Sequence, residues 1–125
     1  MSIVRLLARS AFATLFIAGG LSTVREPGGR AKRVDDTLGL PHPRLMVRLN
    51  GGGMVVLGSA LALGVKPRLA ATGLAAMLVP TTYVGHQFWA EEDAQAKRLQ
   101  KVHFQKNVSL IGGLVLYALG DNRMV

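Results

Sequence analysis

The chain has 125 residues, which is room for one domain. Half of the residues are apolar, 18% are charged and the mean hydropathy is +0.31, so the composition is more apolar than that of an ordinary soluble domain. The formal net charge is +8, and the absence of cysteine excludes disulfides, thiol nucleophiles and cysteine-ligated metal centres within this chain.

Four segments are apolar enough to predict membrane-spanning helices, at about residues 5–24, 44–65, 67–89 and 102–120. A helix rises 1.5 Å per residue, so about 20 residues cross a hydrocarbon core of roughly 30 Å. The sequence therefore predicts an all-α fold, a transmembrane four-helix bundle made by a single domain over residues 1–125. We expect a multi-pass protein of the cell membrane, inner or plasma.

The first segment follows Arg5 and Arg9 and has the features of a signal peptide as well as of a retained span. Three later apolar segments favour a retained span. Small residues recur at intervals of four and predict the face that packs on a neighbouring helix: Ser10, Thr14, Ala18 and Ser22.

The connections set the order of the helices. Pro27, Gly28 and Gly29 end the first helix and open a polar loop over residues 25–43. The short turn at residues 64–67 makes the second and third spans antiparallel neighbours. Pro80 lies inside the third span and predicts a kink.

The polar segment at residues 90–101 has an acidic start and a basic end, which suits a short helix because these charges complement the helix dipole. The apolar part of the fourth span is short. His103, Lys106 and Asn107 therefore lie in or near the headgroup region, on one helix face.

If four spans alternate, the polar residues at the ends of spans two, three and four share one leaflet. Ionisable groups at membrane depth are costly and indicate a functional site by default. The candidate cluster for binding a quinone, a lipid or an anion comprises Arg48, Asn50, Thr82, His86, His103, Lys106 and Asn107.

Other interpretations of this cluster stay open. The basic side chains also suit snorkelling to lipid phosphates, and the amides and histidines suit hydrogen bonds between helices. Zinc held by His86, His103 and a carboxylate is a further alternative, but the spacing matches no standard motif, so we predict no metal. No catalytic residue is predicted.

Most lysines and arginines lie at the ends of the apolar segments, which favours membrane lipids as partners and argues against nucleic acid. The loops at residues 25–43 and 86–103 hold the larger share, which predicts a cytoplasmic location for them. Arg5 and Arg9 before the first span favour the opposite orientation, so orientation stays open.

Four motifs together resemble the DoxX family of small four-span bacterial membrane proteins, most of all its actinobacterial branch. They are Val47-Arg48-Leu49-Asn50-Gly51-Gly52, Lys66-Pro67-Arg68-Leu69-Ala70-Ala71, Leu78-Val79-Pro80-Thr81-Thr82 followed by Gly85-His86-Gln87-Phe88-Trp89, and His103-Phe104-Gln105-Lys106-Asn107. The resemblance covers residues 5–121 and implies a four-helix membrane bundle.

The resemblance also implies a role. Family members are linked to thiosulfate:quinone oxidoreductase subunits, and a mycobacterial relative to a membrane complex for redox stress with a superoxide dismutase and a sulfurtransferase. We therefore expect a non-catalytic anchor or accessory subunit with protein partners in a membrane redox complex. A quinone-binding oxidoreductase subunit and a lipid or small-molecule binding module are the alternatives.

Overall fold

The computed structural model describes residues 2–120, and every regular element in this range is a helix. The elements are α1 (Ile3–Arg25), α2 (Gly28–Leu38), α3 (Pro43–Leu63), α4 (Pro67–Gly85), the short 3-10 helix η1 (Phe88–Ala90) and α5 (Ala94–Leu119). The all-α prediction is confirmed. The two ends of the predicted domain, residue 1 and residues 121–125, lie outside the described residues.

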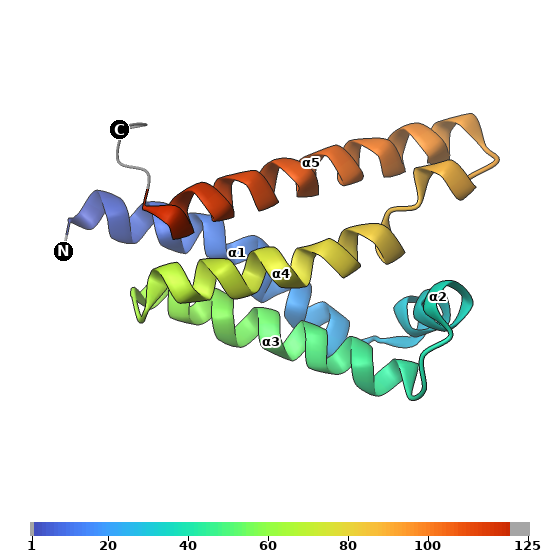
Figure 1. Cartoon of the computed structure of the whole chain (residues 1–125), viewed down its shortest axis with the longest axis horizontal. Helices are drawn as coiled ribbons and strands as arrows, with labels where there is room; N and C mark the ends of the chain where they lie inside the picture. Colours follow the sequence, from blue (N-terminus) through green and yellow to red (C-terminus); the bar gives the residue numbers. More distant parts are fainter. Residues whose placement is uncertain (1, 121–125) are drawn as a thin grey trace.

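Four long helices lie along a common direction, as Figure 1 shows. α3 packs on α1 and on α4, and α4 packs on α5. The start of α1, the α3–α4 turn and the end of α5 lie at one end of the molecule, whereas α2 and the start of α5 lie at the other. We call the end with α2 the polar end, because the polar loops of the sequence fold there.

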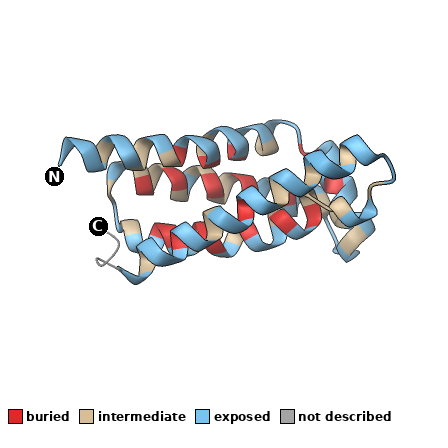
Figure 2. Cartoon of the chain, turned by 90° about the horizontal axis from the view of Figure 1, so that it is seen from above, coloured by how far each residue is buried: buried red, intermediate tan, exposed pale blue. Residues whose placement is uncertain are grey.

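The buried core runs between the long helices and is contributed by all four of them (Figure 2). Its largest members are Phe16 of α1, Met54 and Leu61 of α3, Leu74 of α4 and Leu114 of α5. Large apolar side chains also cover the outer faces. Leu63 and Leu119 are each 69% exposed, a surface that suits hydrocarbon better than water.

Two helices, α1 and α3, are long and apolar enough to span a membrane. Within the described residues, α4 and α5 do not join them by the same measure of length and apolar composition. The two apolar helices thus carry the membrane character that composition indicates, and the four-span arrangement is taken up as a proposal below.

Three features of the helices differ from those expected. α4 ends at Gly85 and not at Trp89, because the chain leaves helical geometry at His86 (φ −129°, ψ 61°). α5 begins at Ala94, so the short helix expected over residues 90–101 runs without a break into the fourth long helix, and the Asp93 carboxylate caps its start by accepting a hydrogen bond from the Ala96 N–H (3.0 Å). The predicted first loop contains α2, which ends at Gly39 in the left-handed conformation (φ 61°).

The packing face of α1 is not the predicted one. Ala13, Phe16 and Gly20 are buried on α1, whereas Thr14, Ala18 and Ser22 are exposed. The buried residues lie at intervals of three and four and include a phenylalanine, and the α1 backbone approaches α3 most closely at Gly20. A Cβ atom on Gly51 would lie 2.7 Å from the Gly20 carbonyl oxygen and 2.9 Å from Thr23 Cβ.

This contact predicts opposite outcomes for two adjacent glycines. Gly51→Ala should destabilise the folded protein by about 1–3 kcal/mol, because the new methyl group forces the α1 and α3 backbones apart. Gly52→Ala is the matched control: nothing lies within 4 Å of its added Cβ, and alanine favours helix over glycine by up to about 1 kcal/mol. Thermal unfolding in detergent measures both, and an equal loss in the two variants would contradict the close α1–α3 contact.

Candidate functional site

A histidine pair joins the end of α4 to α5 at the polar end. His86, the residue that follows α4, stacks on His103 of α5 with ring centroids 5.2 Å apart and an interplanar angle of 25°. The His86 Nδ1 atom lies 2.8 Å from the Gln100 side-chain oxygen. Gln100 and His103 are three residues apart on α5 and so share one face. The structure thus brings together two predicted residues and one, Gln100, that sequence reasoning missed.

The surroundings of His86 disfavour its protonated form. Burial lowers the pKa of His86 below its ordinary value of 6.5, and the charges of His103, Lys106 and Arg33 lower it further. The hydrogen bond with Gln100 acts in the opposite direction, because it favours the protonated ring. The net direction is downward, so His86 is neutral near pH 7.

Aromatic rings hold the segment after His86 against α5. Phe88 and Trp89 of η1 both meet Phe104 edge to face, with ring centroids 5.3 and 5.9 Å apart. Tyr83 of α4 lies 5.8 Å from Trp89, measured between ring centroids. These contacts fix the direction in which the chain leaves α4, and with it the position of His86.

A second polar link joins α3 to α4. The Asn50 side-chain amide donates to the Thr81 hydroxyl at 2.9 Å, and this hydroxyl donates in turn to the Met77 carbonyl at 2.8 Å. Thr81 follows Pro80 and bonds the Met77 carbonyl, one position after the carbonyl of residue 76 that Pro80 leaves without its helical N–H partner. Asn50 is therefore a partner of α4 and lies apart from the histidine pair.

α2 is tied to the chain just after α4 by two further polar contacts. The Arg33 guanidinium donates to the Gly85 carbonyl at 2.7 Å, and the Gln87 amide donates to the Thr37 hydroxyl at 2.8 Å. The carbonyl groups of a last helical turn have no partner within the helix, so a cation there satisfies both a hydrogen bond and the helix dipole. No pattern in the sequence predicts these long-range partners.

Two predicted residues are buried in the bundle. Thr82 and Asn107 are each 4% exposed, Thr82 one helical turn before His86 and Asn107 one turn after His103. Within residues 2–120, the Thr82 hydroxyl oxygen is buried and has no hydrogen-bond partner. A buried hydroxyl without a partner is uncommon, so this atom is a candidate contact for a ligand.

An apolar groove of about 350 Å³ runs between α4 and α5. Val79 of α4 and Ile111 of α5 line it at the end closer to the polar residues. These two residues precede Thr82 by three positions and follow Asn107 by four, about one helical turn in each case. The groove thus leads away from the unpaired hydroxyl toward the apolar half of the bundle.

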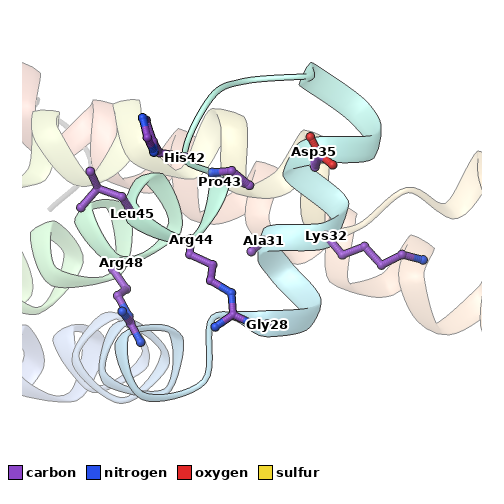
Figure 3. A pocket seen from close by; sticks show the side chains of 9 residues that line it. All are labelled: Gly28, Ala31, Lys32, Asp35, His42, Pro43, Arg44, Leu45 and Arg48. Carbon is purple, nitrogen blue, oxygen red and sulfur yellow. The ribbon is translucent and has the colours of Figure 1, made fainter.

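Arg48 lies apart from the histidine pair. Its guanidinium Nε donates to the Val24 carbonyl of α1 at 3.4 Å, and its side chain lines an open hollow between α2 and the start of α3 (Figure 3). Lys106 is exposed on α5 and acts on His86 only through its charge. Six of the seven candidate residues thus divide among the histidine pair, the Asn50–Thr81 link, the buried pair and the hollow, and Lys106 belongs to none of these groups.

A family comparison places the chain. The DoxX family model matches residues 4–87, which include α1 to α4 and the first two residues after α4. The chain belongs to the DoxX family. The match ends before His103-Phe104-Gln105-Lys106-Asn107, so this motif and the actinobacterial branch stay predictions. No curated protein and no solved structure matches the chain.

The family and the two apolar helices together indicate that this DoxX chain is a membrane protein. Among the residues that the structure describes, no three His, Cys, Asp or Glu side chains gather as a metal-binding group. Several of the described polar side chains form hydrogen bonds between helices.

The lowered pKa of His86 predicts a pH dependence of stability. Above pH 6.5 the ring is neutral in the folded and in the unfolded chain; below 6.5 the unfolded chain binds the proton more readily, so folding stability falls as the pH falls toward the folded-state pKa. The melting temperature in detergent should therefore drop between pH 7.5 and 5.5. The drop should be smaller in His86→Gln and unchanged in the control His42→Asn, and an equal drop in His86→Gln would contradict the assignment.

Proposed function

We propose that this DoxX chain is a four-span protein of the cell membrane that serves as a non-catalytic anchor or accessory subunit of a membrane-associated redox system. Its spans are α1, α3, α4 and the part of α5 after residue 101. The polar end, with α2 and the first turns of α5, is the part that meets partner proteins.

The lengths of the helices support four spans. α4 has 19 residues, about 28 Å, and α5 has 26, about 39 Å. The first turns of α5 are polar, and the remainder, residues 102–119, is about 27 Å long, close to a hydrocarbon core of roughly 30 Å. The outer faces agree, since Leu69 and Val79 of α4 and Val108 of α5 are half or more exposed.

The observation that carries the anchor role is how the polar side chains are used. The links Asn50–Thr81 and His86–Gln100 each join two different helices, and Arg33 joins α2 to the last residue of α4. Polar groups that form hydrogen bonds with one another do not need a substrate as a hydrogen-bond partner. They fix the shape of the polar end, which is what a docking platform requires.

The side chains that face the partner are exposed cations that take no part in these hydrogen bonds. Lys97, Arg98 and Lys101 on the first turns of α5 are exposed, and Lys101 also lies over the Phe88 ring, 5.9 Å from its centroid. A basic surface of this kind steers and orients an acidic partner. The redox character of the partner comes from the family resemblance alone.

Affinity purification from native membranes, with mass spectrometry of both proteins and bound small molecules, tests the anchor role. The wild type should retain partner proteins near stoichiometry. The variant Lys97→Gln/Arg98→Gln should lose them at least about tenfold, if each cation contributes on the order of 1 kcal/mol. The control Arg5→Gln/Arg9→Gln, at the other end of the bundle, should retain them. Loss in neither variant, or equal loss in both, would contradict docking through α5.

The unpaired Thr82 hydroxyl favours one second candidate, a quinone-binding subunit. Two features fit a quinone: the Thr82 hydroxyl could donate to a quinone oxygen, and the apolar α4–α5 groove one turn away could take an isoprenoid tail. A bound quinone would supply electron transfer within the membrane. A quinone in the same purification that is lost in Thr82→Val and kept in the control Thr14→Val, an exposed threonine of α1 outside the groove, would support this candidate over the anchor role alone.

A further inference from the structure

The proposed anchor role does not use the hollow between α2 and the start of α3. It has a volume of about 630 Å³ and is open on one side. Its charged lining consists of Lys32, Arg44 and Arg48 together with a single acid, Asp35. Three cations against one acid give the hollow a net positive charge near pH 7.

Two arginines give the hollow its chemistry. Arg44 and Arg48 are four residues apart and therefore lie on one face of α3. In the view of Figure 3 both side chains extend to the same side of α3, away from Asp35. Arg48 uses its Nε on the Val24 carbonyl, whereas the guanidinium of Arg44 has no hydrogen bond or ion pair within residues 2–120. Guanidinium groups in this position match the paired oxygens of a phosphate.

If α1 and α3 span the membrane, the hollow lies at the depth of lipid headgroups. It is formed by α2 and the start of α3, a few residues after the end of α1, and α1 and α3 are the two helices whose length and hydropathy suit a membrane span. Arg44 is in the first turn of α3, and Arg48 lies about 6 Å further along the helix, toward the hydrocarbon core. A phosphate held by both would sit at the boundary between water and hydrocarbon.

An exposed apolar face continues from the hollow along α3. Leu45 lines the hollow and is 55% exposed, and Leu49 and Val56 follow it with exposed fractions of 63% and 67%. Spacings of four and seven residues place these side chains on one face of the helix. Between them Gly52 leaves open space, because nothing lies within 4 Å of a Cβ built on it. This face has the length and the character of a track for an acyl chain.

We propose that this hollow is a binding site for an anionic phospholipid, with the phosphate on Arg44 and Arg48 and an acyl chain along Leu45, Leu49 and Val56. The apolar track distinguishes a lipid from a free phosphate, which would use the arginines alone. The site does not depend on the anchor role, since a chain without any partner protein would still bind the lipid.

Native mass spectrometry of the full chain, released from detergent with added phosphatidylglycerol or phosphatidylcholine, tests the site. The wild type should retain phosphatidylglycerol in preference to phosphatidylcholine. Arg44→Gln should reduce this preference about fivefold and Arg44→Gln/Arg48→Gln more than tenfold, since each cation near a headgroup is worth about that factor. The matched control is Arg30→Gln, which removes an exposed arginine of α2 outside the hollow and should leave the preference within twofold.

Three outcomes would overturn the assignment. They are a wild type without preference, an equal loss in Arg30→Gln, and displacement of the lipid by millimolar inorganic phosphate, which would assign the arginines to a free anion. Arg44→Gln keeps the test valid if the double variant is unstable, because Arg44 forms no bond in the described part of the chain. Helical circular dichroism of each variant checks that the bundle is intact.

Discussion

Polar groups removed from water must find partners inside the protein, and at the polar end of this bundle they find them across helices. Asn50 of α3 bonds Thr81 of α4, and His86 after α4 bonds Gln100 of α5. In a low-dielectric setting each such bond is costly to break, because a group left alone has no water to replace its partner. The order of the helices at this end follows from these pairs.

The other half of the bundle is held by shape. Apolar side chains gain little by leaving lipid for a protein interior, so close contact between backbones carries more of the stability there. Gly20 and Gly51 provide this contact between α1 and α3, and Leu74 fills the centre with no exposed surface. Hydrogen bonds between helices at the polar end and close packing along the rest of the bundle together select one arrangement of the helices.

The sequence predicts the helices better than it predicts their ends and partners. The lengths of the apolar segments predicted the four long helices, and the sequence motifs predicted membership of the DoxX family. Hydropathy carries no information about the Asp93 cap or the break at His86. The start of α5 at Ala94 and the end of α4 at Gly85 were therefore not predicted. The order of the spans predicted that His103 lies near His86. It could not predict that Arg48 lies beside α2, because this contact depends on how the chain folds after α1.

The account depends most on α4 and α5 crossing the membrane. The chain has no cysteine, so single cysteines can be labelled in intact cells with a membrane-impermeant maleimide. Four spans predict that Lys32→Cys and Arg98→Cys react from the same side of the membrane and Val65→Cys, in the α3–α4 turn, from the opposite side. If only α1 and α3 span, Arg98→Cys and Val65→Cys would react from the same side, and the four-span bundle would be wrong.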